Sequence, residues 1–100
     1  MAKGYWIASV TVTDPDRYVG YQSLAPKAFA KFGARFLARG GDSVTLEGTD
    51  FQRHVVIEFD SKDAALACYH SPEYQTARQH RDAACDANIV IVEGLETTAK

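Results

Sequence analysis

Arg39 and Glu58 are the two charged residues whose predicted placement most favours chemistry. They belong to segments 34–39 and 53–59, which read as neighbouring strands, and strand residues of matching parity share one face of a sheet. An arginine can orient an anion, and a nearby carboxylate whose proton affinity is tuned by burial can act as a general base. The same two residues would equally form a salt bridge that makes a dimer interface specific. Both interpretations stay open.

Ser9 and His54 are predicted on the same sheet face as that pair. His54 and Glu58 stand four residues apart on one strand, about 13 Å, so they form no dyad within a chain. His54 could contact a group across a dimer, or it could be a polar residue satisfied by ordinary hydrogen bonds. No spacing of histidines and carboxylates is typical of a metal site, and we expect none.

The predicted helix 72–86 carries Tyr74 and Arg78 on one stripe, together with Arg81. Arginines on the side that should face protein are explained by an anionic ligand under the helix, or by stems that lie along apolar surface with their charged ends at its edge. Tyrosines from both helical regions could line a pocket between helices and sheet, or be ordinary core: Tyr18, Tyr21, Tyr69 and Tyr74. No nucleophile set or phosphate-binding glycine loop is recognisable, and no cofactor is expected.

The elements that must position these side chains follow from residue patterns. Segments rich in β-branched and aromatic residues predict strands at 5–13, 34–39, 53–59 and 89–93, and 44–47 could add a short one. A first helix begins at Asp14-Pro15 and ends at Gly33, with a kink or break near 23–25 because Pro26 removes a backbone hydrogen bond. A second helical region divides at Ser71-Pro72 into about 62–70 and 72–86.

This order of elements, βαββαβ, predicts an α+β ferredoxin-like domain: a four-stranded antiparallel sheet with two helices on one face. Side-chain alternation then divides the strands into two sets. The wholly apolar set is expected under the helices: Trp6, Ala8, Val10, Val12, Phe36, Ala38, Val55, Ile57, Phe59, Val90 and Val92. The mixed set comprises Tyr5, Ile7, Ser9, Thr11, Arg35, Leu37, Arg39, His54, Val56, Glu58, Ile89, Ile91 and Glu93. No third layer remains to cover the mixed face, so we expect a second copy of the chain to pack there.

Composition limits the classes of partner. The chain has 100 residues and a formal net charge of -2. A protein without an excess of basic residues is not expected to bind nucleic acid. The chain contains neither an apolar run of the ~20 residues that span a bilayer nor a signal peptide, so no membrane partner is expected and the cytoplasm is the default location. We expect one domain over 1–96 and a tail over 97–100. Cys68 and Cys85, both assigned to the second helical region, are expected to be reduced.

Several motifs in a fixed order resemble the domain of unknown function 1330 family. They are Lys3-Gly4-Tyr5-Trp6-Ile7-Ala8, Phe36-Leu37-Ala38-Arg39-Gly40-Gly41, Val55-Val56-Ile57-Glu58-Phe59, Ser71-Pro72-Glu73-Tyr74-Gln75 and Ile91-Val92-Glu93-Gly94. The resemblance covers nearly the whole chain and implies a dimeric α+β barrel. It implies no activity, although the wider superfamily includes cofactor-independent oxygenases, haem enzymes and small-molecule isomerases.

Two hypotheses for function remain. In the first, a homodimeric module binds or transforms a small organic molecule, which could be an anion, near Arg39, Glu58 and His54. In the second, the chain is a structural dimerisation domain without a ligand. An arginine and a carboxylate exposed in a cleft would favour the first hypothesis, whereas full pairing of both inside a dry interface would favour the second.

Overall fold

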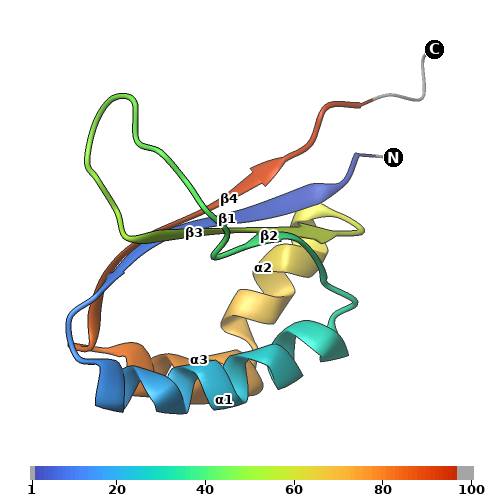
Figure 1. The fold of residues 1–100 in the computed structure, drawn as a ribbon. Helices are drawn as coiled ribbons and strands as arrows, with labels where there is room; N and C mark the ends of the chain where they lie inside the picture. The colour runs from blue at the N-terminus through green and yellow to red at the C-terminus, as the bar shows by residue number, and fades with distance from the viewer. Residues whose placement is uncertain (1, 97–100) are drawn as a thin grey trace.

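The computed structural model describes residues 2–96, so the predicted tail at 97–100 lies outside the described residues (Figure 1). Four strands and three helices follow one another along the chain: β1 (Gly4–Val12), α1 (Pro15–Lys31), β2 (Arg35–Arg39), β3 (Arg53–Phe59), α2 (Lys62–His70), α3 (Pro72–Arg81) and β4 (Cys85–Glu93). The strands form one antiparallel sheet in the order β2-β3-β1-β4. All three helices lie on one side of it (Figure 1), which confirms the predicted ferredoxin-like fold.

Each helix begins at a short polar side chain that caps its first turn. Asp14 accepts a hydrogen bond from the backbone N–H of Arg17, and Ser61 accepts one from that of Ala64. Ser71 accepts from Tyr74 N–H and divides α2 from α3, as predicted. Among residues 2–96 no helix is long and apolar enough to cross a membrane.

Helix α1 runs without interruption through Pro26, so of the kink or break predicted near 23–25 the break does not occur. A proline removes one backbone hydrogen bond but does not forbid helical geometry on either side of it. The residues around it, Ala25, Ala28 and Phe29, are buried against the rest of the protein. This packing holds the helix together where local propensity alone would weaken it.

The core fills the space between the sheet and the helices. Trp6 of β1 is 1% exposed and lies at its centre. The indole makes edge contacts with Phe29 and Tyr74, at ring-centroid distances of 5.0 and 4.9 Å. Such edge-to-face pairs contribute beyond the area that they bury. Helix α1 contributes Tyr18, Ala25, Ala28 and Phe29 to this core.

Strand β4 differs from the prediction in its start and in its facing. It begins at Cys85 rather than at residue 89, because α3 ends at Arg81 and Ala83 takes a positive φ of 62°. In its register with β1, Trp6 pairs with Ile91 and Ile7 with Val90. Ile89 and Ile91 therefore pack under the helices, whereas Val90 and Val92 lie on the face without helices, the reverse of what we predicted.

Strand β2 carries a bulge that changes the facing of its second half. Phe36 pairs with Ile57 and Ala38 with Val56, so two steps along β2 match one step along β3. The extra residue places Ala38 on the open face and turns Arg39 toward the helices. The prediction for these two residues is therefore wrong. Segment 44–47 forms no strand, and the connection 40–52 rises over the open face (Figure 1).

Candidate functional site

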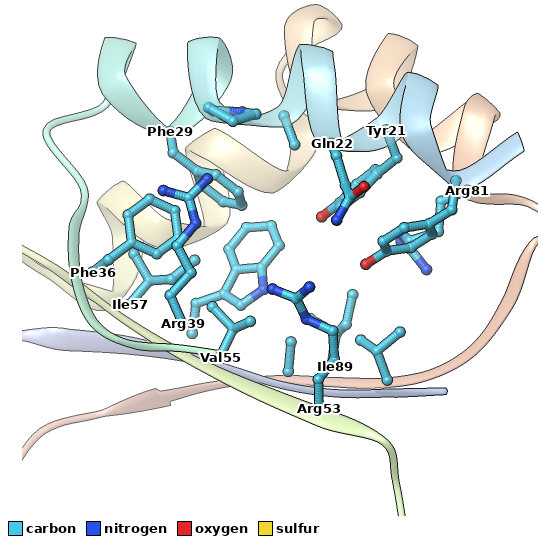
Figure 2. A pocket seen from close by; sticks show the side chains of 16 residues that line it. Tyr21, Gln22, Phe29, Phe36, Arg39, Arg53, Val55, Ile57, Arg81 and Ile89 are labelled. Carbon is cyan, nitrogen blue, oxygen red and sulfur yellow. The ribbon is translucent and has the colours of Figure 1, made fainter. Parts of the chain in front are cut away.

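A cavity of about 110 Å³ lies between the helix-facing side of the sheet and helices α1 and α3 (Figure 2). Most of its wall is aromatic or aliphatic. The strands contribute Trp6, Ala8, Val10, Phe36, Arg39, Arg53, Val55, Ile57 and Ile89, and the helices contribute Tyr18, Tyr21, Gln22, Ala25, Pro26, Phe29 and Arg81. A mainly apolar hollow with a few polar groups is the usual form of a small-molecule site.

Three arginines supply the charge of this cavity. Arg39 extends from β2, Arg53 from β3 and Arg81 from α3, and Figure 2 shows the Arg53 guanidinium in the middle of the space. The Nε atoms of Arg53 and Arg81 are buried and have no hydrogen-bond partner within residues 2–96. Among those residues, the cavity lining contains no Asp or Glu. Because unsatisfied buried donors cost free energy, an anion in the cavity would be stabilised by these groups.

Local contacts hold two of the arginines in place. The Cζ atom of Arg39 lies 4.3 Å from the centre of the Phe36 ring, a cation–π contact. Arg53 passes close to the backbone at Gly40, where an added Cβ would lie 2.9 Å from Arg53 Nη2. Gly40 also has a φ of +68°, which favours glycine. A glycine at position 40 therefore permits both the positive φ of the turn and the close approach of the Arg53 guanidinium.

Arg81 is joined to two tyrosines. Its Nη2 atom donates to the Tyr74 hydroxyl at 3.5 Å, and the Tyr21 and Tyr74 hydroxyls lie 2.9 Å apart. Burial raises the pKa of Tyr21 well above its usual value, and the nearby Tyr74 raises it further. Burial also raises the pKa of Tyr74. Both hydroxyls therefore keep their protons at neutral pH. Tyr21 lines the cavity, whereas Tyr74 lies in the core behind it.

The predicted pair of Arg39 and Glu58 does not form. Arg35 Nε donates to Glu58 Oε1 at 2.9 Å and the Tyr5 hydroxyl donates to Oε2 at 3.1 Å, on the open face. Arg39 points to the opposite face because of the β2 bulge. The hydrogen bond from Arg35 lowers the pKa of Glu58. This direction is the opposite of what a general base with raised proton affinity needs.

Ser9 and His54 also lie on the open face, as predicted. They are directly paired between β1 and β3, and Ser9 Oγ is 3.0 Å from His54 Nδ1. The histidine is thus satisfied by a neighbouring hydroxyl, and it stands apart from the cavity. Arg78 of α3 does not line the cavity either. Among residues 2–96, no group of three or more metal-ligating side chains could hold a metal ion.

Of Ser9, Arg39, His54, Glu58, Tyr74 and Arg78, only Arg39 lines the cavity, and Tyr74 supports it from behind. Tyr18, Tyr21 and Arg81, which the sequence offered as possible pocket or anion contacts, do line it, whereas Arg53 was not singled out. A signal for Arg53 existed, because it has the parity of Val55 and Ile57 on the same strand, which placed it on the helix-facing side. Arg81 already stood on the protein-facing stripe of its helix, one turn from Arg78.

Comparison with known proteins identifies the family and the fold. The family model described as Domain of unknown function (DUF1330) matches residues 3–95. No curated protein matches the chain. A protein of unknown function from Rhodopseudomonas palustris has a TM-score of 0.73 at 20% identity, covering 96% of this chain and 85% of that chain. A dimeric ferredoxin-like protein of unknown function from Jannaschia sp. CCS1 has a TM-score of 0.67 at 17% identity, covering 95% and 99%.

A third similar structure is SnoaB, described as a cofactor-independent oxygenase from Streptomyces nogalater. Its TM-score is 0.59 at 13% identity, and the match covers 100% of both chains. At such low identities these likenesses show a shared fold and no shared chemistry.

Proposed function

Because the chain belongs to the domain of unknown function 1330 family, whose name assigns no activity, we propose a function from its own cavity: binding of a small organic anion with an apolar tail. One observation carries the proposal. Two buried arginine Nε atoms, in Arg53 and Arg81, have no hydrogen-bond partner within residues 2–96, and the described residues that line the cavity include no Asp or Glu. A carboxylate is charged at neutral pH and can accept two parallel hydrogen bonds from one guanidinium group, which are stronger than hydrogen bonds between neutral groups.

The size and wall of the cavity limit the rest of the ligand. A cavity of about 110 Å³ is somewhat smaller than the ~150 Å³ cavity that holds benzene in an engineered protein. The wall around Trp6, Phe29 and Phe36 suits a short alkyl chain. The ligand class is therefore a monocarboxylate with a short alkyl chain.

We further propose that two copies of the chain pack through the open face of the sheet. That face has exposed apolar side chains in Ile7, Val90 and Val92. Two of the similar solved structures, from Jannaschia and Thermobifida fusca, are described as dimeric ferredoxin-like proteins. The cavity lies on the opposite side of the sheet, so dimerisation alone does not require a ligand. The alternative function is a purely structural dimerisation domain, and the experiment must distinguish it from an anion-binding protein.

Trp6 provides the test, because it is the only tryptophan of the chain and lines the cavity. Hexanoate and hexan-1-ol share a chain, but only hexanoate carries a charge. We expect hexanoate to change the Trp6 emission saturably, with an affinity at least about tenfold above that of hexan-1-ol, as charged hydrogen bonds require. Native mass spectrometry should show one hexanoate per chain. Equal affinities for the two compounds would show that the cavity binds apolar chains without recognising the charge. If neither compound binds, the alternative of a structural dimerisation domain without a ligand is favoured.

A further inference from the structure

The hydroxyl of Tyr21 is one of the polar groups contributed by residues that line the cavity. It lies on the cavity wall and is 2.9 Å from the Tyr74 hydroxyl. Within residues 2–96, Tyr21 Oη has no other hydrogen-bond partner. The direction of the Tyr21 O–H bond therefore depends on whether Tyr74 donates its own hydroxyl proton to the Tyr21 oxygen.

The direction of the hydrogen bonds follows from Arg81. A guanidinium has donors only, so the Tyr74 oxygen accepts from Arg81 Nη2. Tyr74 is fully buried, and the only other partner of its hydroxyl among residues 2–96 is Tyr21. The Tyr74 proton is thus satisfied when it is donated to Tyr21, since a buried hydroxyl proton without an acceptor costs free energy. The Tyr21 oxygen then accepts from Tyr74, which leaves its own proton free for the cavity.

We propose that Tyr21 O–H donates a hydrogen bond to an oxygen on the carbon next to the ligand carboxylate, so that the cavity selects 2-oxo acids over plain carboxylic acids. This inference rests on the proposed binding of an organic anion. The two donors are near each other, because Arg81 Nη2 and Tyr21 Oη lie 3.5 and 2.9 Å from the same Tyr74 oxygen. A 2-oxo acid carries its carboxylate and its carbonyl oxygen on adjacent carbons, which matches neighbouring donors on Arg81 and Tyr21.

Burial supports this role because it raises the pKa of Tyr21 well above the usual value. The hydroxyl stays protonated throughout the neutral range and remains a donor. The positive charge of Arg81 opposes that shift but does not reverse it. Tyr69 provides an internal comparison, because its ring centroid lies 5.8 Å from that of Trp6 but the residue does not line the cavity.

The test compares 2-oxohexanoate with hexanoate by Trp6 emission and by isothermal calorimetry, in the unmodified protein and in two variants. We expect the unmodified protein to bind 2-oxohexanoate about three- to tenfold more tightly than hexanoate, as one added hydrogen bond predicts. Tyr21→Phe should abolish this preference and leave hexanoate binding nearly unchanged. Tyr69→Phe, the matched control outside the cavity lining, should keep the preference.

A second measurement needs no variant and therefore survives a Tyr21→Phe protein that fails to fold. 2-Methylenehexanoate has the shape of 2-oxohexanoate but lacks the acceptor oxygen, and it should bind no more tightly than hexanoate. Equal binding of the oxo and methylene acids would overturn the inference while the anion site stands. A preference that persists in folded Tyr21→Phe would do the same. If neither hexanoate nor 2-oxohexanoate binds, both the site and the inference fail.

Discussion

Arg35 and Arg39 project from opposite faces of the sheet although they stand four positions apart on one strand. In a regular strand this spacing would place them on the same face. The bulge between Phe36 and Ala38 adds one residue, so Arg35 pairs with Glu58 on the open face while Arg39 reaches the cavity. One backbone irregularity thereby separates the ion pair of the surface from the cations of the cavity.

Replacing a cavity arginine should weaken binding of the anion. We expect Arg81→Gln and Arg53→Gln each to lower the affinity for hexanoate by about 10- to 100-fold, the effect of losing a hydrogen bond to a charged group. Arg78→Gln is the matched control, because Arg78 lies on the same helix as Arg81 but outside the cavity lining. Calorimetric titration of the three variants measures the effect. An equal loss in Arg78→Gln would show that only overall charge matters.

A charge on the open face should separate the proposed dimer. Val90 on this face and Val19 on α1 are similarly exposed, at 48% and 55%. We expect Val90→Glu to give a chain of 11.0 kDa in light scattering at micromolar concentration, whereas Val19→Glu keeps twice that mass. A monomeric Val90→Glu protein should still bind hexanoate, because the cavity lies on the other side of the sheet. A dimer that tolerates Val90→Glu would contradict this interface.

The carboxylate of Glu58 should stabilise the fold in a pH-dependent way. The hydrogen bond from Arg35 lowers the folded-state pKa of Glu58 below its usual 4.5. Its contribution is then present above about pH 4.5 and is lost as pH falls through the folded-state pKa. Urea denaturation should therefore show a lower free energy of unfolding for Glu58→Gln than for the unmodified protein at pH 7, and a smaller difference at pH 3.

The control for that measurement is Glu47→Gln, in the exposed connection between β2 and β3. It should follow the unmodified protein at both pH values. A Glu58→Gln difference that is the same at pH 3 and pH 7 would disprove the linkage.

Gly4 should not tolerate a side chain. A Cβ at this position would collide with the backbone of Ser61 and Lys62 at the start of α2. Backbone atoms yield less readily than a flexible side chain, so we expect Gly4→Ala to lower the free energy of unfolding by about 1–3 kcal/mol. Gly41→Ala is the matched control, since no atom of the part of the chain that the structure describes lies within 4 Å of its added Cβ. Thermal denaturation measures the stability of both variants. Equal unfolding temperatures for Gly4→Ala and Gly41→Ala would refute the prediction.

Much of the fold was predictable because its signals are local. The residue types of 53–59 predicted β3 with its observed bounds, and polar side chains before prolines predicted the starts of α1 and α3. The facing of β4 was not predictable in this way. Its segment Ile89-Val90-Ile91-Val92 is apolar at every position, so alternation contains no information about which side is buried. Only the pairing with β1 decides it.

The site was less predictable because it depends on backbone geometry. Nothing in the types of Phe36, Leu37 and Ala38 signals a bulge, yet that bulge decides where Arg39 points. Ala83 is likewise an ordinary helix-forming type, but its positive φ ends the turn after α3 and so starts β4 early. The bulge explains why Ala38 and Arg39 were assigned to the wrong faces, and Ala83 explains why the start of β4 was missed.

The bulge in β2 also affects how this protein meets other sheets. β2 is an edge of the sheet, and an edge strand exposes unpaired N–H and C=O groups to which another chain can add. An irregular, five-residue strand with arginines at both ends is a poor template for such addition. β4, at the other edge, is nine residues long. The distortion that delivers Arg39 to the cavity therefore also protects one edge from aggregation.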